Sequence, residues 1–127
     1  MKNLNEVTFE NGIMVVNTTP HMIRFIEESG AIVEVQSSGI IINADSMEEV
    51  VYENEELKLV TPTFISTIGG EDAIQYINEK LPGAIIVGSI IAAQAYPKKI
   101  VAMIPHPDFV RVPPAEKKML TNRFTIY

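Results

Sequence analysis

Short apolar segments separated by turn signals fill the first half of the chain, and this pattern most constrains its fold. Asn11-Gly12 lies between apolar segments at residues 7–9 and 13–16. Asn-Gly in such a setting is the strongest short-range signal for a β-hairpin. Gly30 occupies a similar place within residues 22–36, where apolar and polar side chains then alternate. The first half therefore predicts two hairpins of half-buried strands.

The second half adds helices. Residues 71–81 carry apolar side chains at helical spacing, with acids at the start and Lys80 at the end, which matches the helix dipole. Pro82-Gly83 ends this helix. Ser89 is a candidate N-cap for a second, short helix. The other predicted features are a break at Gly69-Gly70, that short helix at residues 90–96, strands at residues 40–42, 50–52, 57–60, 84–87, 100–104 and 124–127, and an extended loop at residues 105–114. The sequence thus predicts a single α+β domain over residues 1–127, mostly antiparallel β-sheet with two short helices.

Composition narrows the class of protein. The chain has no cysteine, which excludes a disulfide framework and thiolate metal sites and fits a reducing cytosol. No basic segment followed by an apolar one opens the chain, so a cytoplasmic location is expected. The longest uncharged stretch, residues 81–97, is interrupted by Pro82-Gly83 and is shorter than the roughly twenty residues of a membrane helix. This apolar stretch in so short a chain, with six methionines, predicts a homo-oligomer.

Charge is divided unevenly along the sequence. Residues 1–97 hold fourteen acidic and four basic side chains, whereas residues 98–127 hold two acidic and six basic ones. The two parts carry −10 and +4, which sum to the net charge of −6. The overall acidity argues against a general nucleic-acid binder. The division predicts that a small anionic ligand is contacted mostly by the last thirty residues.

The segment Thr18-Thr19-Pro20-His21 lies between two predicted strands and must turn sharply. Thr19 and His21 are candidate ligand contacts through their hydroxyl and imidazole groups. The alternative is a structural corner in which His21 satisfies buried backbone groups.

The basic tail supplies the other candidate ligand-binding residues. In an extended segment Phe109 and Arg111 share one face, where the ring stacks on a base and the guanidinium pairs with phosphate. Tyr96 is an alternative stacking surface, and Lys98 or Lys99 adds positive charge. The alternative for both lysines is a solvated loop.

No catalytic residue, metal site or cofactor is expected from the motifs. His21 and His106 are not in a metal-ligand spacing, and the chain has no P-loop, G-x-G-x-x-G or G-x-S-x-G. Ser38 and Ser89 fit a turn serine and a helix cap better than nucleophiles.

Several of these segments resemble a family of small uncharacterised phage and prophage proteins. Its members begin with an apolar strand followed by (Asn/Leu)-Thr-Pro-His, which residues 16–21 resemble. Ser38-Gly39, residues 82–95 and residues 105–111 resemble its later elements, although Ser37 replaces a usual proline and Asn43 a common arginine. By analogy with phage proteins of this size, the resemblance implies an anti-defence role of the anti-Thoeris or anti-CBASS sponge type.

Three functions follow as hypotheses. The first is non-enzymatic sequestration of a small anionic, nucleotide-derived immune signal. The second is a protein–protein inhibitor that blocks a host enzyme with an acidic surface at residues 48–56. The third is an enzyme that degrades the same signals with His21 or His106 as general base.

Overall fold

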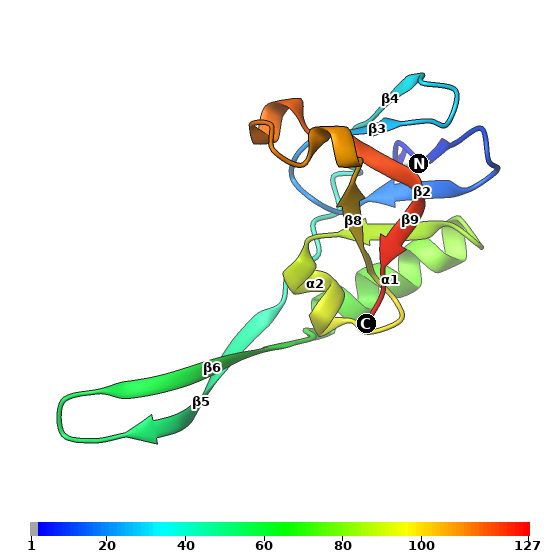
Figure 1. The fold of residues 1–127 in the computed structure, drawn as a ribbon. Coiled ribbons are helices and arrows are strands. Elements are labelled where there is room, and N and C mark those ends of the chain that lie inside the picture. Colours follow the sequence, from blue (N-terminus) through cyan, green and yellow to red (C-terminus); the bar gives the residue numbers. More distant parts are fainter. Residues whose placement is uncertain (1–2) are drawn as a thin grey trace.

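The computed structural model describes residues 3–127, which form two separate β-sheets and two α-helices (Figure 1). The predicted α+β class, with β-structure dominant, is confirmed. In chain order the elements are β1 (Val7–Thr8), β2 (Met14–Asn17), β3 (Ile23–Ile26), β4 (Ile32–Val35), β5 (Asp45–Glu53), β6 (Lys58–Ile65), α1 (Ile68–Lys80), β7 (Ile85–Gly88), α2 (Ile90–Ala95), β8 (Val101–Pro105), the 3-10 turns η1 (Pro107–Phe109) and η2 (Pro114–Glu116), and β9 (Met119–Thr125).

The larger sheet has seven strands in the order β1-β2-β7-β8-β9-β3-β4. The hairpins β1–β2 and β3–β4 are antiparallel, as is β8–β9, whereas β2–β7, β7–β8 and β3–β9 are parallel. An isolated parallel bridge between Asn17 and Ser37 connects the two sides of the sheet. The sheet therefore curls almost into a closed cylinder.

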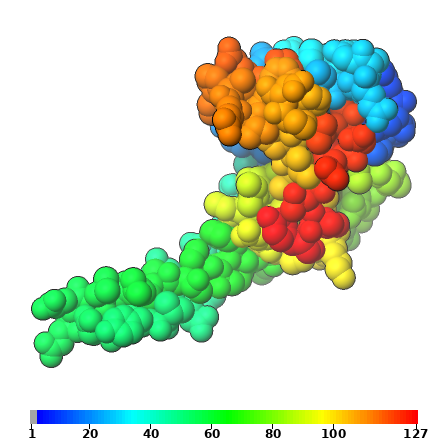
Figure 2. Space-filling view, viewed as in Figure 1, coloured from blue at the N-terminus to red at the C-terminus, as the bar shows by residue number. Residues whose placement is uncertain are grey.

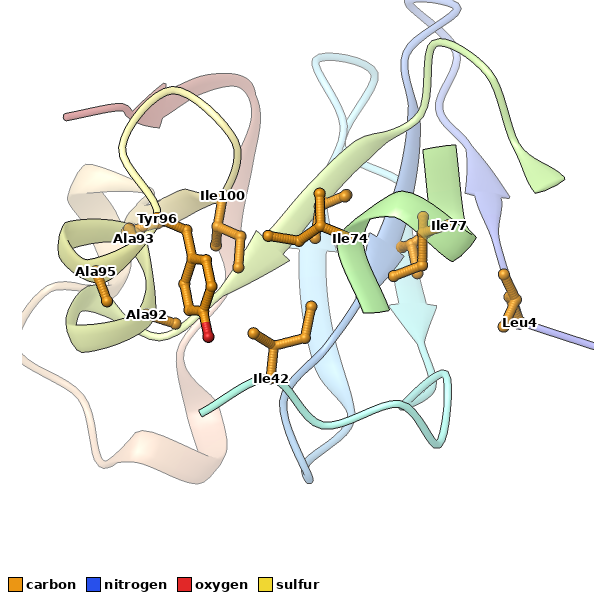
Figure 3. Close-up of a cluster of buried hydrophobic side chains, with 12 residues drawn as sticks. Leu4, Ile42, Ile74, Ile77, Ala92, Ala93, Ala95, Tyr96 and Ile100 are labelled. Atoms are coloured by element: carbon orange, nitrogen blue, oxygen red, sulfur yellow. The ribbon is translucent and has the colours of Figure 1, made fainter. Parts of the chain in front are cut away.

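The curled sheet is buried on both of its faces. Val15 and Val87 point into one core, which includes Phe25, while Val16 and its neighbours on the other face join the core under the helices. Alternate residues of a strand point to opposite faces, so β2 and β7 contribute to both cores. Figure 3 shows the second core, in which side chains of α1 and α2 meet those of the sheet.

Both helices start at capping side chains. Thr67 Oγ1 accepts a hydrogen bond from the Gly70 N–H at 2.9 Å, and Ser89 Oγ accepts one from the Ala92 N–H at 3.0 Å. The predicted helix cap at Ser89 is confirmed. The strand pattern does end before Gly69-Gly70, but the helix predicted from residue 71 begins earlier, at Ile68, so both glycines lie in the first turn of α1.

Three other local predictions are corrected. Residues 40–42 form no strand: Ser38 holds a turn around Ile40, and the Ile42 N–H donates to Thr18 O instead of to a strand ladder. Residues 105–114 are not extended, because the short turn η1 follows His106. The last strand, β9, starts before the predicted range, at Met119, and ends at Thr125.

β5 and β6 form an arm outside the main sheet and pair only with each other. The arm projects from the body of the molecule (Figures 1 and 2). Asn54 and Leu57 close its tip through a backbone hydrogen bond, so the predicted acidic turn between the strands is confirmed. The predicted strands at residues 50–52 and 57–60 are parts of these longer strands.

Candidate functional site

The Thr18–His21 segment is held as a corner by the buried side chain of Asn17. Asn17 Nδ2 donates to His21 O at 2.7 Å and to Val35 O at 3.1 Å. Its Oδ1 accepts from both the N–H and the hydroxyl of Thr19. Thr18, also buried, donates its hydroxyl to Val87 O at 2.8 Å. The corner therefore joins β2 to β4 and β7 through polar contacts.

Thr19 and His21 have different places in this corner. The Thr19 hydroxyl is occupied by Asn17 and by His21 O, at 2.7 and 3.0 Å. His21 is exposed, and its hydrogen bonds within residues 3–127 are made by its backbone. The segment is thus a structural corner held by Asn17 and Thr19, and the predicted role of His21 in satisfying buried backbone groups is wrong.

Tyr96 is buried, with a side chain 1% exposed. Its hydroxyl donates to Asn43 O at 2.9 Å and accepts from the Thr67 N–H at 3.0 Å. Asn43 precedes the arm and Thr67 follows it, so one hydroxyl ties together both ends of the arm. A ring without an open face offers no stacking surface, and the prediction that Tyr96 stacks on a ligand is wrong.

Lys98 and Lys99 lie beside the C-terminus and α1. The Lys98 N–H donates to Tyr127 O, and Lys98 adopts a positive φ of 63°. Lys99 Nζ forms an ion pair with Glu71 Oε2 at 2.8 Å, with both side chains partly exposed. Exposed pairs of this kind contribute little stability.

Phe109 and Arg111 lie at the other end of β8, in the loop that carries η1 and η2 (Figure 1, orange). The Phe109 ring lies edge-on to His106, and Lys118 Nζ lies 4.3 Å from its centroid. Arg111 is exposed in the turn after η1. Because η1 is helical, Phe109 and Arg111 do not alternate along an extended segment as predicted. The structure thus separates this pair from Lys98 and Lys99.

A small basic pocket lies where this loop meets β3. Its volume is about 130 Å³, and Arg24 and Lys117 are the charged residues that line it. Arg24 Nη1 donates to Ala115 O at 3.0 Å and Nε pairs with Glu34, while Lys117 Nζ donates to Val110 O at 2.9 Å. These contacts hold both cations at the pocket and leave each with further donors. The remaining lining residues are Met22, Ile23, Met103, Pro114, Ala115 and Met119.

Sequence reasoning missed both charged residues of the pocket, Lys117 and Arg24. Arg24 is the one arginine among the first 97 residues, alternating with buried Ile23 and Phe25 on β3. The position of Arg24 could have indicated a site, because the side chain of a single cation between buried apolar residues of a strand points away from the core. Which partner it meets depends on the parallel pairing of β3 with β9.

The hydrogen bonding of His106 limits its use as a general base. His106 Nδ1 accepts the Asp108 N–H at 3.1 Å, so the proton of the neutral ring lies on Nε2. Nδ1 is therefore engaged and is not an available base. Among residues 3–127 no group of three or more histidine or carboxylate side chains is placed to hold a metal ion.

Glu27, which directly follows β3, is a buried acid. Glu27 is 5% exposed; Oε2 accepts the Glu10 N–H at 2.8 Å, whereas Oε1 has no hydrogen-bond partner among the described residues. Oε1 is also shielded from solvent, so it faces protein. This burial was not predictable from the sequence, because Glu27 precedes an ordinary polar turn.

Neither helix within residues 3–127 is long and apolar enough to cross a membrane. Comparisons with protein-family models, curated proteins and solved structures found no match for this chain.

Proposed function

We propose that this protein binds a small anionic, nucleotide-derived ligand without transforming it, at the pocket lined by Arg24 and Lys117. The observation that carries the proposal is that these two cations, from segments far apart in the sequence, line one pocket together with three methionines. Guanidinium and ammonium groups bind phosphate oxygens through charge-assisted hydrogen bonds. Methionine side chains adapt to flat or irregular apolar groups.

The size of the pocket limits what it holds. Pockets for drug-sized ligands are about 300–1,000 Å³, and this one is about 130 Å³. It therefore fits one phosphate or one small part of a larger ligand. Arg111 follows Val110, whose carbonyl accepts from Lys117, and is placed to contact the remainder.

The biological role proposed for this binding is phage anti-defence in the cytoplasm of an infected bacterium, by sequestering an immune signal. It is supported by the resemblance of residues 16–21 and 105–111 to the phage family and by the basic pocket.

The test is incubation of the protein with a panel of signalling nucleotides, followed by removal of the protein and analysis of the supernatant. Depletion of a nucleotide, then its release intact on heat denaturation, is the expected result. Release of an altered nucleotide would establish an enzyme. If no nucleotide is depleted, the second candidate, a protein–protein inhibitor, becomes the better explanation. The observation in its favour is the acidic arm that projects from the body.

Variants locate the site. Lys117→Ala and Arg24→Gln should each weaken binding at least about tenfold, because a charge-assisted hydrogen bond is worth about 1.5–3 kcal/mol. Arg111→Ala should have the smaller effect, since Lys117 lines the pocket and Arg111 does not. Lys80→Ala, at the exposed end of α1, is the matched control. Equal affinities for all four variants would refute this location.

A further inference from the structure

Within residues 3–127 of a single chain, no layer covers the arm formed by β5 and β6. Every residue from 45 to 63 is exposed. An isolated two-stranded hairpin is at best marginally stable in water, and both of its edges present unpaired backbone groups. The arm nevertheless has nine and eight residues in its strands, which makes it about 30 Å long.

Apolar side chains occupy both faces of the arm. Val50 pairs with Val60 on one face, and Tyr52 pairs with Leu59 on the other. Large exposed apolar patches on soluble proteins mark surfaces that another molecule covers. The exposed large apolar residues of the arm are Met47, Val50, Val51, Tyr52, Leu57, Leu59, Val60 and Ile65.

This apolar surface continues onto the body at the base of the arm. α2 packs against β6. Ile68 follows the arm and is 84% exposed, and Ile90 and Ile91 of α2 are 59% and 46% exposed. A second apolar patch therefore lies next to the one on the arm.

Charge indicates what covers the arm. Residues 45–58 hold six acidic side chains and one lysine, a net charge of −5, whereas residues 98–127 carry +4. Lys98 and Tyr127 lie on the body, and the arm extends away from it (Figure 1), so the acidic arm does not lie on its own basic segment. A second copy of the chain offers an apolar complement at α2 and a basic one at the exposed Lys98.

The base of the arm is held in place before any partner arrives. The Tyr96 hydroxyl binds Asn43 O and the Thr67 N–H, the residues on either side of the arm. A Cβ on Gly70 would overlap that hydroxyl, so the glycine is required for this close approach. A fixed base lowers the entropy lost when the arm docks.

We propose that the arm docks on a second copy of this chain, with its apolar faces against the partner's α2 and arm base and its acidic tip toward the partner's Lys98 and Lys99. Reciprocal docking of the two arms gives a two-fold symmetric assembly, the commonest kind. The proposal is independent of the ligand pocket, which lies at the other end of β8.

The test is the mass of the full chain in solution, measured by light scattering over a concentration series. A multiple of 14.1 kDa is expected for the parent protein. Leu59→Asp and Val51→Asp, on the arm, should weaken self-association at least about tenfold, as charges at the centre of an apolar contact do. Ile32→Asp, at an exposed apolar position on β4, is the matched control and should not change the mass. A monomeric parent, or an oligomer unchanged by both arm variants, would overturn the proposal.

Hydrogen exchange of the parent protein provides a second measurement that needs no substitution. Amides of β5 and β6 should exchange more slowly at high protein concentration, where docking stabilises the arm, and faster on dilution. Arm amides that exchange at one rate at every concentration would contradict docking on a second copy. If they do so while the mass shows an oligomer, the copies associate elsewhere.

The absence of cysteine allows a direct test of what the arm touches. Glu55→Cys places a thiol at the arm tip and Lys98→Cys one on the body. Disulfide-linked dimers should form in a mixture of the two variants faster than in either alone. Equal rates of disulfide formation in the three samples would refute contact between the acidic tip of one copy and Lys98 of the other.

Discussion

Tyr96→Phe removes one oxygen atom from a fully buried side chain and tests whether that hydroxyl secures the base of the arm. The substitution leaves the Thr67 N–H and the Asn43 carbonyl without their partner. A buried polar group left unpaired costs about 1–3 kcal/mol. Asn43 is exposed and can bind water instead, whereas Thr67 is half-buried. The expected loss of unfolding free energy is therefore about 2 kcal/mol.

That loss converts to a measurable shift in melting temperature. With an unfolding entropy of about 2.1 cal/mol/K per residue, a chain of 127 residues has about 0.27 kcal/mol/K. A loss of about 2 kcal/mol then lowers Tm by about 7 °C. Circular dichroism during heating measures Tm, and urea unfolding at one temperature gives the free energy directly.

Tyr76→Phe is the matched control, because Tyr76 is half-buried and its ring packs under Lys80. Its hydroxyl makes no hydrogen bond within residues 3–127, so this change should shift Tm by less than about 2 °C. Hydrogen exchange should also accelerate at the Thr67 amide in Tyr96→Phe alone. Equal Tm values for the two variants would refute the assigned role of the Tyr96 hydroxyl.

Four further substitutions test other features, three of them at buried residues and one, His21→Ala, at an exposed residue. Gly70→Ala should lower Tm more than Tyr96→Phe does, because its Cβ would overlap the tyrosine hydroxyl; a neutral or raised Tm would contradict that close packing. Glu27→Gln should leave the urea midpoint unchanged or raise it, because it removes a buried charge that has no cationic partner in the described residues; a lower midpoint would indicate a compensating partner. Asn17→Ala should cost about 2–4 kcal/mol in urea unfolding, since four hydrogen bonds end on that amide, whereas His21→Ala should change it by less than about 0.5 kcal/mol; the reverse order would make His21 the support of the corner.

Local features of the fold followed from the sequence because they depend on neighbouring residues. Asn11-Gly12 and Gly30 predicted the two hairpins, and both glycines adopt the positive φ that such turns need, at 87° and 91°. Ser89 and Pro82-Gly83 marked helix ends through capping and the conformational limits of proline. The acidic turn of the arm was also predictable, since its hydrogen bonds are made within residues 54–57.

The tertiary structure alone decided what depends on contacts between distant segments. Periodicity tells which face of a strand is buried but not which strand lies beside it, so the parallel pairing of β3 with β9 was not predictable. That pairing brings Arg24 to Lys117, while the length of β8 separates Lys98 from Arg111. Tyr96 was expected at a ligand and is instead buried, because Asn43 and Thr67 converge on its hydroxyl only when both ends of the arm meet α2. Residue types determined which chemistry was available, and the chain's long-range packing determined where it was assembled.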